Sequence, residues 1–188
     1  MIVKNLSGEN FRNLLPFSAE FCEDTNIIYG NNAQGKTNIL ESIFLCATTK
    51  SHKGSKDKEI IHFDKEEAHI RTYLQKEDDE IRVDMHLRKN KSKGIAINCE
   101  KIKKASELIG LLNIVFFSPE DLSIVKNGPA ERRRFMNLEL CQLNKLYYYN
   151  YVNYNKALNQ RNTLLKQIHF NPKLTDTLDM WDDYLMEY

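Results

Sequence analysis

The sequence has almost no net charge and contains no long apolar run. Its 27 Lys and Arg residues are balanced by 26 Asp and Glu residues, which leaves a formal net charge of +1. This balance excludes a whole-molecule electrostatic attraction to nucleic acid or to a membrane surface, so any such argument must rest on local clusters. No stretch approaches the roughly 18 apolar residues of a membrane-spanning helix. We therefore expect no membrane partner.

Paired cysteines are also missing. The cysteines Cys22, Cys46, Cys99 and Cys141 are scattered, and no two of them have the spacing of a zinc or redox motif. We expect all four to be reduced and buried as small apolar side chains. No secretory signal follows Met1, and together these features favour a cytoplasmic location.

The larger, N-terminal part of the sequence combines strand patterns with one clear helix pattern. Strands are predicted at 2–6, 15–21, 25–29, 70–74, 81–87, 95–98 and 113–117. The alternation in 70–74 and 81–87, on either side of an acidic turn, predicts an antiparallel meander that continues into 95–98. The segments 25–29 and 113–117 are apolar runs typical of buried strands. A helix is predicted from Lys36 onward and a short one around 105–111.

Strand patterns stop in the last third of the sequence. From 130 to 168 there is no proline and no glycine, and apolar residues recur at helical spacing, which predicts one or two long helices. A break at Asn171-Pro172 precedes a final helix that is still running at Tyr188. We expect an N-terminal lobe, 1–128, and the start of an incomplete helical lobe, 129–188.

One segment carries nucleotide chemistry. The phosphate-loop pattern G-x-x-x-x-G-K-T is matched by Gly30, Asn31, Asn32, Ala33, Gln34, Gly35, Lys36 and Thr37. Gly30 and Gly35 permit backbone angles that turn successive N–H groups toward an anion, and the following helix N-terminus adds favourable potential. Lys36 is expected to reach the β- and γ-phosphates, and the Thr37 hydroxyl to ligate Mg²⁺. The loop predicts binding of a nucleoside triphosphate, ATP by preference.

The groups needed for hydrolysis are not apparent. Hydrolysis also requires a second carboxylate for Mg²⁺ at the end of an apolar strand, and a group that orients the attacking water. No predicted strand ends in Asp-Glu. Asp84 lies inside an alternating strand, and Asp182 and Asp183 lie on a predicted helix. We therefore assign no catalytic residue.

Several motifs together resemble one family. The segment 30–44, preceded by Asn10-Phe11-Arg12-Asn13, resembles the head domain of SMC-like ABC ATPases. The segments 51–53, 117–122 and 128–135 narrow the resemblance to the RecF family. This resemblance covers the whole chain. It implies an α/β P-loop NTPase fold of ABC/SMC-head type, with a mixed sheet, an antiparallel β subdomain and a helical lobe that is cut short.

The resemblance also implies a function in DNA replication and repair. RecF-family proteins bind DNA, form ATP-dependent homodimers, and act with RecR and RecO to load recombinase at gaps. The family's signature motif and second metal-binding carboxylate lie further along than this chain extends. Relatives carry a glutamine after the strand that here ends at Phe117. This sequence offers Glu120 and Asp121 instead, which leaves open the group that contacts the metal or the water.

Further site residues follow from the same resemblance. It places Arg12 and Asn13 near the nucleotide, although a plain turn has the same pattern. His52 and Lys53 follow the phosphate-loop helix and are candidates to face nucleotide or DNA; a surface loop is the alternative.

Basic residues gather at two further places. Lys89, Lys91 and Lys93 lie in a predicted hairpin turn, and Arg132 and Arg133 open the helical region. These are candidate contacts to DNA phosphates, which would be made without reading sequence. A solvated hairpin tip has the same pattern, and successive residues cannot share one helix face.

Three functions are consistent with these features. The first is an ATP-gated DNA-binding protein whose hydrolysis needs residues outside this sequence. The second is a nucleotide-binding scaffold that docks a partner and catalyses no reaction. The third, a small-molecule kinase using the same loop, is disfavoured because no lid-like arginine cluster follows a short helix.

Overall fold

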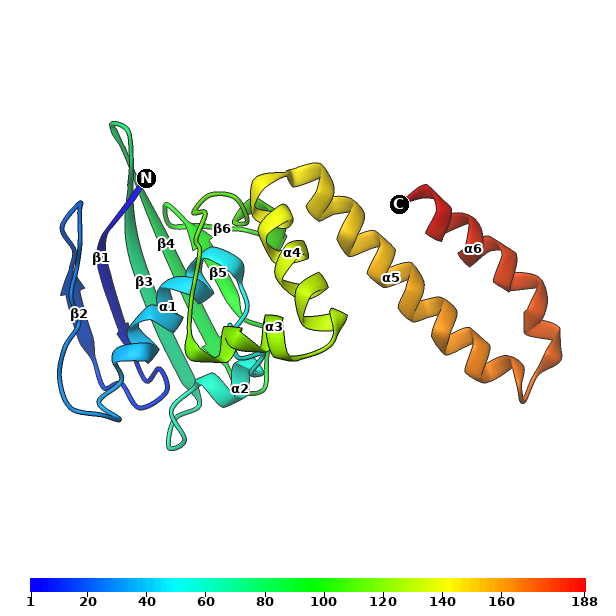
Figure 1. Cartoon of the computed structure of the whole chain (residues 1–188), viewed down its shortest axis with the longest axis horizontal. Helices are drawn as coiled ribbons and strands as arrows, with labels where there is room; N and C mark the ends of the chain where they lie inside the picture. The colour runs from blue at the N-terminus through cyan, green and yellow to red at the C-terminus, as the bar shows by residue number, and fades with distance from the viewer. The chain divides into compact units, whose positions relative to one another are not determined.

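The computed structural model describes the whole backbone, residues 1–188, and all side chains except those of Glu120 and Ser123. The chain divides into two compact units, Met1–Phe116 and Phe117–Tyr188, drawn in Figure 1. This division lies nearer the N-terminus than the expected boundary between 128 and 129. The loop of the first unit that leads into α1 carries the nucleotide motif.

The first unit is built on a six-stranded antiparallel sheet with the order β2-β1-β3-β4-β5-β6. The strands are β1 (Ile2–Glu9), β2 (Phe17–Glu20), β3 (Glu67–Lys76), β4 (Asp79–Arg88), β5 (Gly94–Ile97) and β6 (Glu100–Lys101). β3 and β4 pair over their whole length and are joined by a tight turn in which Glu77 has a φ of 54°. β5 pairs with β4, which confirms the predicted meander.

Helix α1 (Lys36–Thr48) covers one face of this sheet, where it packs against β3 and β4 (Figure 1). The strand residues that face it are buried: Ala68, Ile70, Thr72 and Leu74 of β3 and Val83, Met85 and Leu87 of β4. Because side chains alternate along a strand, the residues between them point to the opposite, outer face, which is polar. The short helix α2 (Asp57–Ile60) and the 3₁₀ turn η1 (Ala105–Glu107) complete the unit; the helix expected around 105–111 is thus only a 3₁₀ turn.

Two predicted strands are not strands in the structure. Residues 25–29 and 113–117 belong to no strand, and Ile27, Tyr29 and Val115 are about four-fifths exposed or more, at 80%, 89% and 79%. A strand exists only when a neighbouring strand takes its backbone hydrogen bonds. No segment of the described chain pairs with either run, so the expectation of two buried strands was wrong for this structure.

The second unit is helical, as predicted. Its elements are η2 (Pro119–Leu122), α3 (Ser123–Lys126), α4 (Pro129–Leu143), α5 (Lys145–Ile168), η3 (Pro172–Thr177) and α6 (Leu178–Glu187). Asn144 separates α4 from α5 and caps α5, because its Oδ1 accepts hydrogen bonds from the N–H groups of Leu146 and Tyr147 at 2.8 and 3.0 Å. An ion pair between Arg161 and Asp182 joins α5 to α6. None of the described helices combines the length and the apolar character needed to span a membrane.

The cysteines divide into two classes. All four are free; Cys46 and Cys141 are buried, whereas Cys22 and Cys99 are exposed. The expectation that all four are buried was therefore wrong for Cys22 and Cys99, which lie in connections outside the helices and strands. Burial raises the pKa of the Cys46 thiol to about 12, so Cys46 behaves as a small apolar side chain of the core.

Candidate nucleotide-binding site

The backbone of the phosphate loop has the left-handed residues that an anion-binding loop needs. Gly30, Ala33 and Gly35 have φ angles of 143°, 64° and 93°. Glycine takes such angles without penalty, whereas Ala33 does so against its usual preference. Asn31, Asn32, Ala33 and Gln34 are exposed. The loop therefore presents an open, curved backbone of the kind that gathers N–H groups around an anion.

Helix α1 begins directly after this loop, with Gly35 as its N-terminal cap. No acidic residue lies in its first turn, so nothing cancels the positive potential of the helix N-terminus. The Lys36 Nζ donates hydrogen bonds to the carbonyls of Gly30 and Asn31 at 2.8 and 2.6 Å. Thr37 is exposed on the same turn. The ammonium group is therefore held over the loop, and the hydroxyl of Thr37 is accessible to a metal ion.

Asn13 holds the loop from the side. Its Nδ2 donates to the carbonyl of Ala33 at 2.8 Å, and its Oδ1 accepts from the Nδ2 of Asn38 on α1 at 2.7 Å. Leu14 packs so closely on the start of α1 that a Cβ at Gly35 would lie 2.4 Å from its Cδ2. The structure thus places Asn13 in direct contact with the loop 30–37 and with the first turn of α1.

Arg12 lies beside Asn13 but engages a different set of groups. Its Nη2 and Nε donate to the two carboxylate oxygens of Glu41 at 2.8 and 3.0 Å, which makes the pair bidentate. Its Nη2 also donates to the Ser55 Oγ at 2.9 Å, and its Nη1 to the carbonyl of Glu59 at 3.0 Å. Arg12 therefore ties the turn at 10–13 to α1 and to the segment around α2.

Glu41 is the buried centre of this network, and sequence reasoning missed it. The residue is 0% exposed, and its Oε1 also accepts a hydrogen bond from the Ser51 Oγ at 2.6 Å. Burial works to raise the pKa of the Glu41 carboxyl, but the hydrogen bonds from Arg12 and Ser51 outweigh it and hold the pKa below its ordinary value. The sequence signal that could have indicated its role is that Glu41 is the one acidic residue within the apolar pattern of α1.

His52 and Lys53 separate in the structure. The His52 ring is nearly buried and contacts Phe44 and Phe116, with ring centroids 6.0 and 4.3 Å away. Its Nδ1 lies 3.8 Å from the Glu41 Oε1. Lys53 is exposed. His52 therefore belongs to the packing around Glu41, whereas Lys53 stays on the surface.

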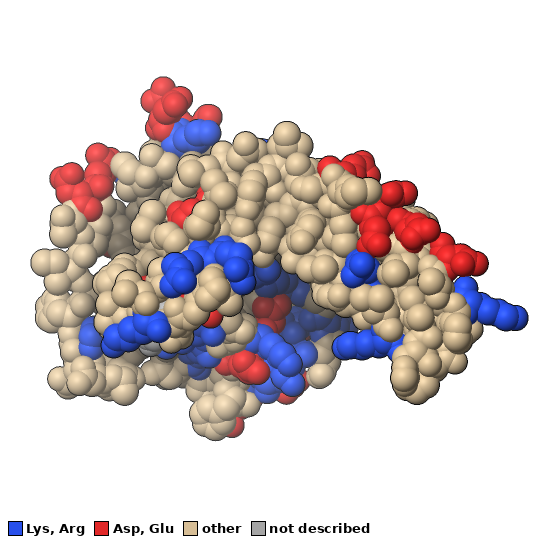
Figure 2. Space-filling model, turned by 45° about the vertical axis from the view of Figure 1, so that its right-hand side comes forward, with Lys and Arg blue, Asp and Glu red and all other residues tan. Residues whose placement is uncertain are grey.

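Most of the candidate DNA-binding residues have local partners. Lys89 pairs with Glu66 at 3.2 Å, and Lys93 pairs with Asp57 at 2.9 Å. Arg132 donates to the carbonyls of Ile124 and Asn127 at 3.3 and 3.2 Å. Of the remaining two, Lys91 and Arg133 are exposed. In the view of Figure 2, Lys and Arg side chains lie mainly across the middle and lower part, whereas most Asp and Glu side chains lie toward the upper edge.

The acidic candidates for metal or water contact are only partly placed. Asp121 of η2 accepts hydrogen bonds from the N–H and Oγ of Ser118, the residue before η2, at 2.6 and 3.0 Å. The side chain of Glu120 lies outside the described residues. Asp84 accepts from Arg71 and Arg82 on the outer face of the sheet. It therefore has the ordinary role of a strand residue.

Comparison with known proteins places this chain in a family. A family model described as an AAA domain matches residues 5–178. The DNA replication and repair protein RecF of Lachnoclostridium phytofermentans is 64% identical over 188 residues, as is that of Agathobacter rectalis. Each match covers all of this chain and 52% of the relative. The chain thus spans about half the length of these relatives.

Solved structures give the same result for the fold. A structure of the recombination mediator protein RecF with ATP superposes with a TM-score of 0.93 at 40% identity, covering 99% of this chain and 50% of that chain. The SMC head domain from Thermotoga maritima gives a TM-score of 0.53 at 17% identity over 69% of this chain and 52% of that one, a likeness in fold alone. The fold is that of a P-loop ATPase of ABC/SMC-head type, as predicted.

Proposed function

The chain belongs to the AAA domain family and is similar throughout to the N-terminal half of RecF proteins, and on this basis we propose that it binds ATP with Mg²⁺ at residues 30–37. The observation that carries the proposal is the phosphate loop itself. Its left-handed residues, the N-terminus of α1 without acidic neighbours, and the Lys36 ammonium all lie within one stretch of eight residues. A RecF protein solved with ATP shares the fold around this stretch.

We assign a role to each group of the loop. The backbone N–H groups between Gly30 and Gly35 surround the β-phosphate, and Lys36 leaves the carbonyls of Gly30 and Asn31 to contact the β- and γ-phosphates. The Thr37 hydroxyl supplies one oxygen ligand to Mg²⁺. Asn13 positions the loop through Ala33 rather than by touching phosphate. Arg12 is assigned to positioning as well, because Glu41 already takes two of its nitrogens.

The test is equilibrium binding of MgATP by the purified protein and by two lysine variants. Lys36→Ala removes the charge at the phosphates and is expected to weaken binding by at least about a hundredfold, which corresponds to the loss of about 3 kcal/mol. Lys50→Ala, at an exposed lysine after the end of α1, is the matched control and is expected to bind normally. Equal affinity of the Lys36 variant and the parent would contradict the proposal.

We propose further that ATP binding gates contact with DNA during replication and repair in the cytoplasm. The support is the similarity to proteins named for DNA replication and repair, and to a recombination mediator of the RecFOR pathway. In this proposal an ATP-dependent homodimer contacts DNA and cooperates with RecR and RecO. Lys91 and Arg133 are the candidate phosphate contacts, because both are exposed, whereas Lys89, Lys93 and Arg132 already bond to local partners. DNA affinity measured with and without MgATP tests this proposal; no dependence on nucleotide would contradict it.

Binding of ATP does not by itself imply its hydrolysis. The competing function is a nucleotide-binding scaffold that does not hydrolyse ATP. Asp84, the strand carboxylate that comes nearest to the required pattern, is ion-paired with Arg71 and Arg82 on the outer face of the sheet. We therefore propose that this chain binds ATP better than it hydrolyses it. Phosphate release under saturating MgATP separates the cases. Turnover that disappears in Lys36→Ala would show that the chain holds a complete catalytic set.

A further inference from the structure

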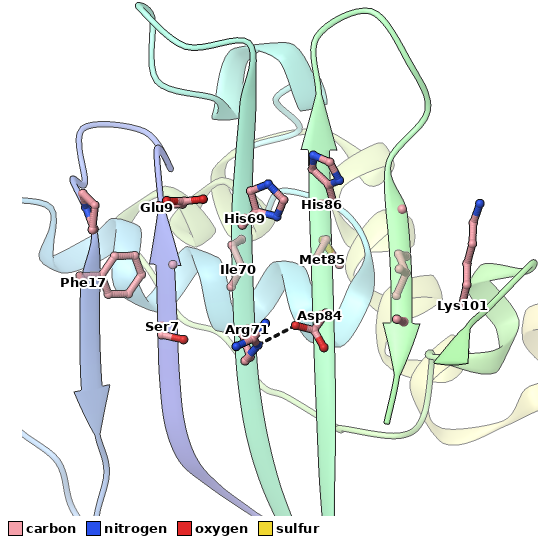
Figure 3. Close-up of a pocket in the computed structure, with 15 residues that line it drawn as sticks. Ser7, Glu9, Phe17, His69, Ile70, Arg71, Asp84, Met85, His86 and Lys101 are labelled. Atoms are coloured by element: carbon pink, nitrogen blue, oxygen red, sulfur yellow. Dashed lines mark hydrogen bonds and ion pairs between the residues drawn. The ribbon is translucent and has the colours of Figure 1, made fainter. Parts of the chain in front are cut away.

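The outer face of the sheet carries a row of potential metal ligands that the nucleotide site does not use. Glu9 of β1, His69 of β3 and His86 of β4 lie directly opposite one another across neighbouring strands. Glu67 precedes His69 by two residues and so shares its face. Figure 3 shows His69 and His86 side by side on adjacent strands, with Glu9 directed toward His69.

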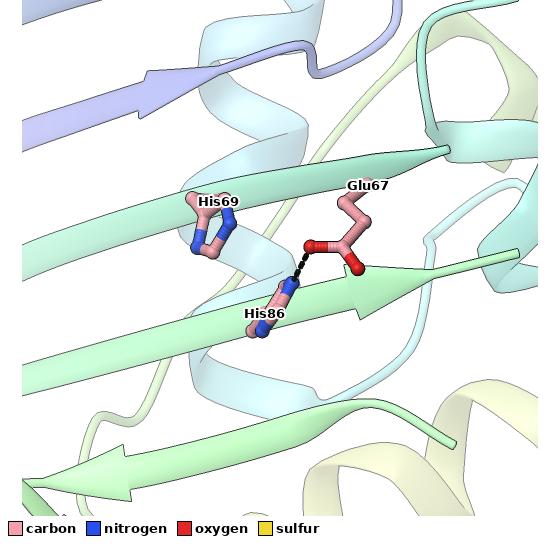
Figure 4. Close-up of side chains that lie close together, drawn as sticks. All are labelled: Glu67, His69 and His86. Carbon is pink, nitrogen blue, oxygen red and sulfur yellow. Dashed lines mark hydrogen bonds and ion pairs between the residues drawn. The ribbon is translucent and has the colours of Figure 1, made fainter. Parts of the chain in front are cut away.

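Three of these side chains converge closely. The His69 and His86 rings are stacked with centroids 4.0 Å apart, and the His86 Nε2 lies 2.6 Å from the Glu67 Oε2 (Figure 4). One nitrogen of each histidine and one oxygen of Glu67 all lie within 4.8 Å of one another. Two imidazoles and a carboxylate are a donor set that Zn²⁺ and similar borderline divalent ions prefer.

We propose that Glu67, His69 and His86 form a binding site for Zn²⁺ on the outer face of the sheet. Ligand atoms at about 2.0–2.2 Å from a tetrahedral ion are separated by roughly 3.3–3.5 Å. The present spacing, from 2.6 Å to at most 4.8 Å, reaches that arrangement through side-chain rotation alone. The paired strands β3 and β4 fix the three Cα positions, so the backbone does not have to move.

The surroundings leave space for an ion and for a further ligand. Gly94 of β5 lies opposite His86 and has no side chain, and His69 and His86 line an open groove together with Glu9. In the proposed site the fourth coordination position is left to a group in this groove. It is available to water, to Glu9, or to a donor brought by a partner, as in zinc sites with three protein ligands.

Two of the three proposed ligands, His69 and Glu67, have shifted pKa values. Burial, together with the neighbouring His86, lowers the pKa of His69, which favours its neutral form. The hydrogen bond from His86 lowers the pKa of the Glu67 carboxyl and keeps it ionised, although burial opposes this effect. Metal ions displace protons from imidazole, so a neutral histidine binds them at lower cost. Arg88 lies opposite Glu67, and its positive charge opposes the binding of a cation at this site.

This site is distinct from the proposed nucleotide site. The phosphate loop leads into α1, which covers the other face of the sheet, and none of the three ligands takes part in the Arg12–Glu41 network. Metal binding can therefore be measured in the absence of nucleotide. Its outcome leaves the ATP proposal unaffected.

The experiment is a calorimetric titration of the purified protein with Zn²⁺, in parallel with His69→Ala, His86→Ala and Glu67→Gln. We expect one saturable site per chain, and each substitution should weaken it at least about tenfold, because even residues that only orient metal ligands contribute that much. His62→Ala is the matched control, since His62 is a histidine that stacks on Phe63, outside the cluster. It should bind as the parent does.

A Co²⁺ titration identifies the donor atoms. The exposed thiols Cys22 and Cys99 are the competing ligands. Visible absorption typical of nitrogen and oxygen ligands, lost in His86→Ala, supports the proposal. A thiolate-to-cobalt charge-transfer band would overturn it. So would the absence of saturable binding, or equal binding by the parent and all three ligand variants.

Discussion

Gly35 shows how much of the candidate site depends on a single residue. Its φ of 93° lies in the left-handed region, and a Cβ added there would lie 2.4 Å from the Leu14 Cδ2 and 3.0 Å from the Asn13 Oδ1. Any other side chain therefore meets backbone strain and steric overlap together. The glycine at this position of the motif serves the packing of α1 on the turn at 10–14 as well as the approach of phosphate.

Replacement of Gly35 by alanine is expected to destabilise the protein by about 1–3 kcal/mol, from strain and from overpacking. Urea unfolding followed by circular dichroism measures the change. Gly94→Ala is the control, because the added carbon would lie 3.8 Å from the His86 Cβ, an ordinary van der Waals distance. That variant should differ from the parent by less than about 0.5 kcal/mol. Equal losses in the two variants would contradict the packing argument.

Glu41 is the second residue on which the site depends. Its carboxylate is buried and receives Arg12 and Ser51, so folding favours the ionised form. The stabilisation is complete above the ordinary Glu pKa of 4.5 and is lost as the pH falls through the lowered pKa of Glu41. The lone acidic residue in the apolar pattern of α1 points to Glu41, but nothing local identifies Arg12 as its partner, because the two are separated by 29 residues.

Glu41→Gln should cost about 3 kcal/mol at neutral pH, because Arg12 then loses its ionic partner in a largely buried position. The difference from the parent should shrink as the pH is lowered below 4.5, because the carboxyl is then protonated in the unfolded chain and, at the lowered pKa of Glu41, in the folded protein as well. Urea midpoints at neutral and acidic pH measure both effects. Glu66→Gln, which breaks an exposed pair with Lys89, should cost less than about 1 kcal/mol. A pH-independent difference for Glu41→Gln would rule out the ionic explanation.

At the scale of elements, local patterns predicted what local interactions determine. The β3–β4 hairpin was predicted because alternation and a turn are both read within 22 residues, from Glu67 to Arg88. The helices of the second unit followed from apolar spacing. The segments 25–29 and 113–117 were mispredicted as strands. An apolar run indicates only that its side chains tend to be buried, whereas a strand also needs a neighbouring strand to take its backbone hydrogen bonds.

The connection between the turn at 10–13 and α1 could be predicted only in part. The resemblance implies that Asn13 lies near the nucleotide, and in the structure its side chain bonds to the Ala33 carbonyl and to Asn38. Arg12 was placed near the nucleotide by the same argument, yet its guanidinium binds Glu41. A sequence motif identifies residues that lie near a site. It does not say which of them contact the ligand and which only hold other residues in position.

Asn13→Ala should weaken MgATP binding by about five- to tenfold, because the loss of about 1 kcal/mol of hydrogen bonding leaves the Ala33 turn less ordered. Fluorescence titration with a labelled ATP analogue measures the change. Asn26→Ala removes a side chain that bonds locally to Cys22 and Asp24, and serves as the control. A larger effect from Asn26 than from Asn13 would contradict the assigned role of Asn13.

At the scale of the whole molecule, the two units differ in the amount of core they contain. The main core cluster, which includes Leu6, Leu45 and Met85, lies entirely within residues 1–116. In the second unit the buried hydrophobic side chains are Cys141, Ala157 and Leu164, and large residues such as Phe170 and Met186 are exposed. Since buried apolar area is the main source of stability, the helical unit should open at a lower denaturant concentration than the sheet unit.

The cysteines provide a probe for each unit. Cys22 and Cys99 should react with a maleimide in the native protein, whereas Cys141 of the helical unit and Cys46 of the sheet unit should not. With increasing urea, Cys141 should become reactive first and Cys46 only when the main core opens. Mass spectrometry of labelled peptides after short pulses locates each modification. Simultaneous labelling of Cys46 and Cys141 would instead show that both units unfold as one cooperative body.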